Sequence, residues 1–373
     1  MAKDDLVKGL EGVVALETTL CDLDGLNGRV TYRGYDITEF ASGRVYEEVA
    51  HLLWCSELPT ASELGALKGA LVAARHLPET VIAILHRLPR DMDPMRVLQA
   101  CAAVLGGFDP DAADNGREAS LRKAIRLTSR MASVTCAYHR IRHGQEPIPP
   151  STDLSHAANF LYMLTGELPS EVSAQALNLT MVFYAEHELN ASTFSARVIA
   201  STLSDMHSAV AGAIGAMRGA LHGGAGEKVI ATIREIGSVE RVEQFVANAL
   251  AAKRKLMGFG HRVYRAGDPR SPILGERADA VCRAKGTERW FRLAVELQRR
   301  VEETRGLQPN VDYYSALIWH ALGIPDDLFT PVIASARVAG WTAHVLEQHE
   351  DNRLIRPRAR YAGPGRRPVP RVP

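Results

Sequence analysis

Apolar residues recur at helical spacing through most of the chain, and this pattern predicts a mainly helical protein. One helix is expected to begin at Thr60-Ala61-Ser62-Glu63, because a Thr followed three residues later by Glu fits a capping box. Pro78 and Asp93-Pro94 mark two more helix starts, with proline in or beside the first turn. Further helices are expected at residues 118–143, 154–166, 169–189, 239–255, 288–304 and 331–348.

Strand signals are scarce and gather near the N-terminus. The runs VVALETTL (13–20) and RVTYRGYDI (29–37) flank the turn-rich stretch DLDGLNG, so they predict one β-hairpin. A parallel sheet would need repeated β-rich runs between the helices, and the sequence lacks them. The expected fold class is therefore all-α with a short N-terminal hairpin, and Asp153 is expected to cap the helix that follows it.

The chain changes character between about Arg218 and Asp312, where glycine and arginine become frequent and irregular stretches appear. This change predicts a small domain at residues 218–320, inserted into a large helical domain made of residues 1–217 and 321–373. From Arg356 onward the sequence RPRARYAGPGRRPVPRVP is too rich in proline for a regular helix. Composition alone predicts that this tail is a solvated extension.

Composition narrows the classes of partner and compartment. The 373 residues are 46% hydrophobic and 23% charged, which is ordinary for a globular protein, and 44 basic residues nearly cancel 43 acidic ones. This balance gives no reason to expect nucleic acid or a membrane as a partner. The five cysteines are widely spaced without a C-x-x-C pair, and the N-terminus lacks a signal-peptide core. We therefore expect a cytoplasmic protein.

Three short motifs hold candidate chemistry. His222 precedes two glycines in LHGGAGE, where a tight turn lets the backbone approach a ligand, although a plain connection between helices has the same composition. His261 lies in GFGHRVYRAGDPR, whose glycines and basic residues suit an anion; a flexible basic loop would look alike. Asp312 precedes the helical run YYSALIWHALG, and taken alone it is better interpreted as an N-cap.

Other candidate sites are weaker. His139 and His143 stand one helical turn apart, but no third metal ligand is evident among the arginines around them, so a basic surface helix is favoured and no metal is expected. His187, late in an apolar helical run, is by itself typical of a core histidine. The sequence contains no G-x-S-x-G elbow, which leaves a serine hydrolase without support.

Taken together, these segments resemble the citrate synthase family, most of all its bacterial dimeric branch. The resemblance runs in family order from about residue 9 to residue 364, and the ordered set is highly specific. It is carried by the stretches GLEGVVALETTL, TYRGYDI, PIPPSTDLSHAANFLYM, YAEHELNASTFSARV, LHGGAGE, KLMGFGHRVYRAGDPR, PNVDYYSA, FTPVIASARVAGWTAH and DNRLIRPRARYAGP.

The resemblance implies a role for each matching residue. Asp312 matches the base that removes a proton from the acetyl methyl group, His222 the donor to the enolate oxygen, and His261 the residue that polarises the keto carbonyl. The residues that match the oxaloacetate-binding groups are His187, Arg270, Arg337 and Arg356. The residues that match part of the coenzyme A loop are Lys255, Leu256, Met257, Gly258 and Phe259.

The family also implies a homodimer in which a C-terminal arm carries Arg356 into the neighbouring site, which reverses the compositional view of the tail through about Gly363. The implied reaction condenses acetyl-CoA with oxaloacetate and hydrolyses citryl-CoA, and it needs no cofactor beyond the thioester substrate. Gly226 departs from the family, which usually has asparagine at this place. Three alternatives stay open: 2-methylcitrate synthesis from propionyl-CoA, a non-catalytic CoA-binding protein, and a thioester hydrolase.

Overall fold

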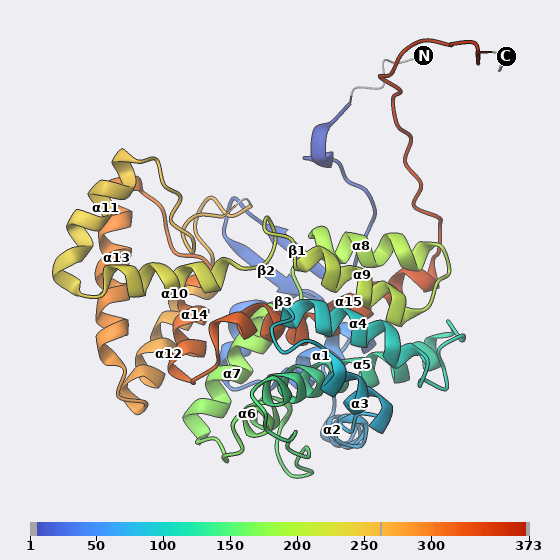
Figure 1. The fold of residues 1–373 in the computed structure, drawn as a ribbon, viewed down its shortest axis with the longest axis horizontal. Coiled ribbons are helices and arrows are strands. Elements are labelled where there is room, and N and C mark those ends of the chain that lie inside the picture. Colours follow the sequence, from blue (N-terminus) through green and yellow to red (C-terminus); the bar gives the residue numbers. More distant parts are fainter. Residues whose placement is uncertain (1–5, 262, 371–373) are drawn as a thin grey trace.

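The computed structural model describes residues 6–261 and 263–370 and is almost wholly helical (Figure 1). The expected all-α class is therefore confirmed. The α-helices are α1 (Tyr46–Cys55), α2 (Ala61–Ala74), α3 (Glu79–Arg87), α4 (Pro94–Gly106), α5 (Arg117–Arg142), α6 (His156–Thr165), α7 (Glu171–Tyr184), α8 (Ala191–Ser201), α9 (Met206–Met217), α10 (Ala225–Ile236), α11 (Val242–Ala251), α12 (Arg270–Ala284), α13 (Glu288–Arg305), α14 (Val311–Ala321) and α15 (Phe329–Glu350).

The expected N-terminal hairpin is present as part of a small three-stranded antiparallel sheet. Its strands are β1 (Cys21–Asp24), β2 (Arg29–Tyr32) and β3 (Tyr35–Asp36), with β2 in the middle. The expectation of a strand at residues 13–20 was wrong, because that segment is irregular and β1 begins only at Cys21. Residues 13–15 are exposed, Val14 by 87%, so the start of this segment lacks the half-buried surface that a strand needs.

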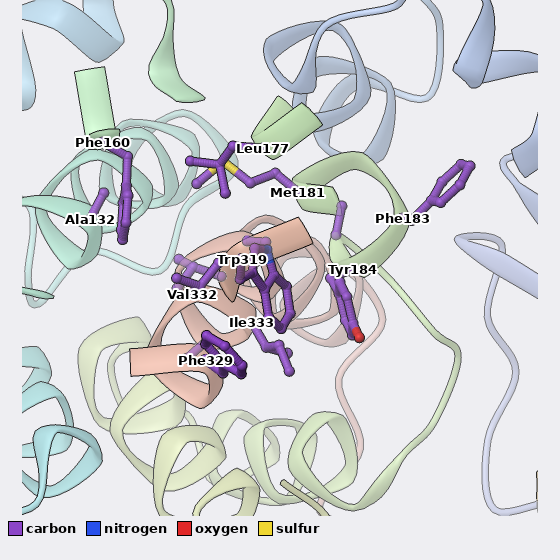
Figure 2. Close-up of a cluster of buried hydrophobic side chains, with 14 of the residues drawn as sticks. Ala132, Phe160, Leu177, Met181, Phe183, Tyr184, Trp319, Phe329, Val332 and Ile333 are labelled. Atoms are coloured by element: carbon purple, nitrogen blue, oxygen red, sulfur yellow. The ribbon is translucent and has the colours of Figure 1, made fainter. Parts of the chain in front are cut away.

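Helix α15 lies at the centre of the fold. Every residue from Leu328 to Leu346 is buried, so the helix is covered on all sides and not on one stripe only. It packs against α1, α5, α7, α8 and α9. Figure 2 shows part of the apolar cluster, where Phe329, Val332 and Ile333 of α15 lie near Trp319 of α14. The helices α10 to α14 gather at one side of the molecule (Figure 1).

Several helix boundaries agree with the local sequence signals. The side chain of Thr60 accepts a hydrogen bond from the Glu63 amide, and the Glu63 carboxylate accepts one from the Thr60 amide, which confirms the capping box. Pro94 opens α4 behind the N-cap Asp93, as expected. The predicted cap at Asp153 was wrong, because the hydroxyl of Ser155 caps α6 two residues later.

The end of α7 differs from the expectation in a way that matters for the site. The helix was expected to continue to residue 189, but it ends at Tyr184. The hydroxyl of Tyr32 is 2.8 Å from the carbonyl oxygen of Glu186 and 3.2 Å from that of Val182, so a distant side chain contacts the backbone where this helix ends. His187 therefore lies in the connection to α8.

Within the described part of the chain, the structure has no helix long and apolar enough to cross a bilayer. The described N-terminal segment and the tail after α15 both project from the helical body (Figure 1). The tail is exposed along most of its length.

Candidate active site

Six of the predicted catalytic and oxaloacetate-binding residues come from five separate parts of the chain and meet in one region. The rings of His187 and His261 have centroids 5.5 Å apart, and Nη2 of Arg270 lies 3.4 Å from Nε2 of His187. Arg337 and His222 are also near enough to lower the pKa of His187, in addition to the larger effect of its burial. The contributing segments are the α7–α8 connection (His187), the α9–α10 loop (His222), the α11–α12 loop and the start of α12 (His261, Arg270), the first turn of α14 (Asp312) and α15 (Arg337).

His187 lies between a phenol and a guanidinium group. Its Nε2 atom is 2.8 Å from the hydroxyl of Tyr264 and 3.4 Å from Nη2 of Arg270. Arginine can only donate, so Nε2 accepts, and the proton of the neutral ring sits on Nδ1. Burial holds the pKa of His187 well below its ordinary value, and the nearby guanidinium groups lower it further. His187 is therefore a neutral imidazole whose Nδ1–H can donate a hydrogen bond.

His261 is fixed in the opposite tautomer. Its Nδ1 atom accepts hydrogen bonds from the backbone amides of Val263 and Tyr264, at 3.1 and 3.3 Å, so its proton sits on Nε2. Burial, with a smaller contribution from Arg270, lowers its pKa to about 4. The ring stacks on Tyr264 with centroids 4.4 Å apart. The result is an oriented, neutral Nε2–H donor.

The backbone around His261 is tied to the segment that precedes Asp312. The amide of Asn310 donates to the carbonyl oxygen of Gly258, and its side-chain amide donates to the carbonyl oxygen of Gly260. Both glycines have positive φ, at 87° and 72°, a conformation that glycine adopts without strain. These bonds hold the His261 loop beside the start of α14.

His222 follows α9 in a short loop. Its Nε2 atom is 2.8 Å from the hydroxyl of Ser192, which also accepts a hydrogen bond from Nε1 of Trp341. Burial, and then the charge of Arg337, lower the pKa of His222 to about 4, so its ring is neutral near pH 7. Ser192 was not singled out from the sequence, although it lies in the matching stretch YAEHELNASTFSARV.

Gly226 lies in the first turn of α10 and faces an apolar environment. A Cβ atom at this position would lie 3.3 Å from Cδ2 of Phe329, close to Ala316 and Trp319. A larger side chain would require Phe329 to shift. Gly226 therefore stands where the family usually has asparagine, and the rings of Phe329 and Trp319 fill the space beside it.

Asp312 is half-buried where the same segments meet. The N-cap of α14 is Asn310, whose side chain accepts from the Asp312 amide, so the N-cap interpretation of Asp312 was wrong and the residue lies in the first turn. Oδ1 of Asp312 accepts a hydrogen bond from the hydroxyl of Tyr184 at 2.6 Å. Burial raises the pKa of Asp312 above the ordinary value, and the bond from Tyr184 partly opposes this rise.

Two buried guanidinium groups complete the arrangement. Arg270 is held by Asp268 through two bonds of 2.8 Å, from Nε to Oδ1 and from Nη2 to Oδ2. Arg337 donates from Nε to the carbonyl oxygen of Tyr184 at 2.5 Å. Guanidinium groups bind carboxylates through paired donors, so these two arginines beside neutral imidazoles form a site suited to an organic anion.

The remaining predicted residues lie apart from this cluster or at its edge. Arg356 is exposed on the segment that follows α15. In the predicted coenzyme A loop, Leu256 and Gly258 are buried, Lys255 is exposed, and Phe259 packs on Tyr313 with ring centroids 4.6 Å apart.

Comparison with known proteins places this site in a family. A family model described as citrate synthase, C-terminal domain, matches residues 9–358. The chain is 46% identical to a citrate synthase of Haloferax volcanii, with 96% of each chain covered. It is 42% identical to a citrate/2-methylcitrate synthase of Bacillus subtilis, with 95% of this chain and 96% of the relative covered.

Solved structures give the same result. The crystal structure of citrate synthase from Thermotoga maritima matches with a TM-score of 0.86 and 42% identity, covering 98% of each chain. A Thermoplasma acidophilum citrate synthase, solved as a ternary complex with carboxymethyl coenzyme A and oxaloacetate, matches with a TM-score of 0.92 and 33% identity over 100% of this chain and 99% of that one. The chain therefore belongs to the citrate synthase family, a family of enzymes that transfer acyl groups.

Proposed function

We propose that this enzyme condenses the acetyl group of acetyl-CoA with oxaloacetate and then hydrolyses citryl-CoA to citrate and coenzyme A. The observation that carries the proposal is the convergence of a half-buried carboxylate, three neutral imidazoles and two buried guanidinium groups on one site. The condensation needs each of these groups: a base for the methyl proton, donors for two developing oxyanions, and cations for the two carboxylates of the keto acid.

The keto acid is bound by Arg270, Arg337 and His187. The guanidinium groups neutralise its carboxylates, and the Nδ1–H of His187 adds a further donor. Its keto oxygen receives a hydrogen bond from the Nε2–H of His261, whose tautomer suits this task. The same N–H then donates a hydrogen bond to the alkoxide that forms when the new carbon–carbon bond is made.

The thioester is activated by Asp312 and His222. The carboxylate of Asp312 takes a proton from the acetyl methyl group, and burial strengthens it as a base because burial raises its pKa. The hydroxyl of Ser192 donates to Oδ1 of Asn190 at 2.6 Å, accepts from Nε1 of Trp341 and lies 2.8 Å from Nε2 of His222, so this network holds the imidazole ring in place. His222 is then positioned to stabilise the enolate oxygen. The enolate carbon attacks the keto carbon.

The coenzyme A part of the substrate is assigned to residues 255–259. The exposed ammonium group of Lys255 suits a phosphate, and the glycine-containing loop continues directly to His261. We also propose that residues 218–320 form a small domain that closes over the rest of the chain. Closure would keep water from the enolate until citryl-CoA has formed. The thioester is a substrate, and the proposed chemistry uses no further cofactor and no metal.

The enzyme is proposed to act as a homodimer in which Arg356 completes the neighbouring site. Arg356 is exposed on a projecting segment, and its guanidinium group is of the type that the keto-acid site already uses twice. A residue supplied by a partner would explain why a segment so rich in arginine leaves the body of its own chain. No nucleic acid or membrane is involved in this proposal.

Release of free thiol tests the reaction. The purified enzyme is incubated with acetyl-CoA or propionyl-CoA, each with and without oxaloacetate. Release that requires oxaloacetate supports the condensation, and release without it would indicate a thioester hydrolase. No release from a folded protein that still binds coenzyme A would refute the proposal and favour a binding protein.

The same assay separates the acetyl-CoA and propionyl-CoA reactions. A 2-methylcitrate synthase of Shewanella oneidensis is 40% identical over 97% of this chain, so the propionyl reaction is a second candidate. One methylene changes binding in an apolar pocket by only about 1–3 kcal/mol, so both donors are expected to react. A higher kcat/KM for propionyl-CoA than for acetyl-CoA would assign 2-methylcitrate synthesis, and not citrate synthesis, as the function of the enzyme. The His222→Ala variant, expected to lose about 10²–10³-fold in kcat, serves as the control for site-specific turnover.

A further inference from the structure

Tyr184 contacts two parts of the proposed site. It is the last residue of α7, and its ring is buried beside Trp319, with centroids 5.5 Å apart. Figure 2 shows Trp319 and Tyr184 next to each other in the apolar cluster. The hydroxyl of Tyr184 donates to Oδ1 of Asp312 at 2.6 Å, and its backbone carbonyl accepts from Nε of Arg337 at 2.5 Å.

The direction of the Tyr184–Asp312 bond follows from the chemistry of the two groups. Burial, and then the neighbouring charge of Asp312, hold the pKa of Tyr184 well above its ordinary value, so the phenol remains protonated. An ionised carboxylate only accepts hydrogen bonds, so the phenol is the donor. The bond occupies Oδ1 of Asp312 and leaves its second oxygen for another partner.

We propose that Tyr184 is the positioning residue of the catalytic base: it holds Asp312 through Oδ1, so that Oδ2 is directed at the acyl methyl group. This inference rests on the proposed role of Asp312. A carboxylate in the first turn of a helix can rotate about its side-chain bonds, and an anchor on one oxygen removes most of that freedom. Trp319 packs against the Tyr184 ring, and its Nε1 donates to Thr180 at 3.1 Å, so the anchor itself is held in place.

The anchor also affects the protonation of the base. Burial raises the pKa of Asp312, and the hydrogen bond from Tyr184 opposes that rise because it favours the charged form. Loss of the phenol hydroxyl removes the opposing effect, so the pKa rises further. The base acts as a carboxylate, and the acidic limb of its activity therefore moves to higher pH when the hydroxyl is removed.

The Tyr184→Phe variant tests the anchor, since it removes the hydroxyl and keeps both the ring and the backbone carbonyl that serves Arg337. The matched control is Tyr313→Phe, next to Asp312 on α14. The Tyr313 hydroxyl is also buried but donates to the carbonyl oxygen of Ala294, 2.7 Å away. The readouts are kcat/KM for acetyl-CoA against pH, the isotope effect with methyl-deuterated acetyl-CoA, and KM for oxaloacetate.

For Y184F, we expect the acidic limb of kcat/KM to move up by about 1 pH unit, a change that corresponds to loss of one hydrogen bond to a charged group. The plateau kcat should fall by about 10-fold or more, because general base catalysis depends on position, and the isotope effect should increase. KM for oxaloacetate should stay within about twofold, because the carbonyl that holds Arg337 is unchanged. Y313F should keep the wild-type pH profile and isotope effect.

Two results would overturn the inference: a Y184F profile and isotope effect that coincide with wild type, or an equal shift in Y313F. Asp312→Asn separates this failure from failure of the proposed function. If D312N is inactive and Y184F behaves as wild type, only the proposed role of Tyr184 is refuted. If D312N is active, the roles of Asp312 as the base and of Tyr184 as its anchor are both refuted.

If Y184F does not fold, Tyr184→His provides a second variant with a ring and an N–H donor. If Tyr184 anchors Asp312, the Tyr184→His variant should show an isotope effect above the wild-type value, and the acidic limb of its kcat/KM should lie within about 1 pH unit of the wild-type limb. An unchanged isotope effect would refute the proposed role of Tyr184.

Discussion

Substitution of Asp268 by Asn removes one charge from the most buried ion pair of the site and leaves the size of the side chain unchanged. Both carboxylate oxygens of Asp268 are bonded to the Arg270 guanidinium, and Oδ2 also accepts from the amide of Val311 at 2.9 Å. The side chains of Asp268 and Arg270 are 0% and 2% exposed. Asparagine can replace one of these acceptor atoms but not the second, nor the charge.

The expected loss follows from the burial of the remaining cation. Removal of one partner from a buried pair costs about 3–5 kcal/mol, because the other charge stays buried without compensation. We expect D268N to lose about 3 kcal/mol, since the amide oxygen still bonds one donor. Burial alone would raise the pKa of Asp268, but Arg270 more than reverses this and holds it below the ordinary value. The charge therefore stabilises the fold above the ordinary carboxylate pKa, and this contribution is lost as the pH falls through the lowered value.

Thermal unfolding at one fixed protein concentration, with and without oxaloacetate, measures the effect. The concentration is fixed because association would shift the apparent stability. Asp279→Asn on α12, the helix that begins with Arg270, is the matched control, because its partner Arg283 is 70% exposed and exposed pairs often contribute nothing measurable. A loss below about 1 kcal/mol in D268N, or an equal loss in both variants, would refute the reasoning. D268N should also raise KM for oxaloacetate, since Arg270 loses the group that orients it.

Three further results are expected. Asp312→Ala should lower kcat by about 10²–10³-fold with coenzyme A binding retained, measured by thiol release and by equilibrium binding. Co-refolding of Arg356→Ala with D312A should restore activity above that of either variant, because a mixed dimer would contain one complete site; no restoration would place Arg356 in its own site. Gly340→Ala should lower the melting temperature, because its Cβ would overlap the carboxylate of Glu186, whereas Gly69→Ala, in open space on α2, should raise it slightly.

Local signals predicted much of the fold because they act within a few residues. Thr60 and Glu63 form their capping box through contacts three positions apart, and Pro94 opens α4 for an equally local reason. The helical spacing of apolar residues depends on the same short range. Asp153 and Ser155 are both typical N-cap residues, and here the predicted cap lay two residues before the observed one.

The candidate site was predicted from ordered motifs and not from local chemistry. His187 taken alone is typical of a core histidine, and Asp312 taken alone resembles an N-cap. Their proposed roles came from the resemblance of the surrounding stretches to one family. Ser192, Tyr264 and Tyr184 lie inside those same stretches, but no spacing in the sequence marks them as partners of the site residues.

What only the tertiary structure decided is the set of contacts between distant segments. Tyr32 contacts the backbone at the end of α7 from about 150 positions away, at the place where the helix stops short of His187. The amides of Val263 and Tyr264 select the tautomer of His261, and the hydroxyl of Tyr184 reaches Asp312 across 128 positions. The sequence by itself determined most of the helices, some of their caps and the residue types available for catalysis. Packing decided which of those residues meet, because hydrogen bonds and burial depend on distance in space, and separation along the chain does not predict that distance.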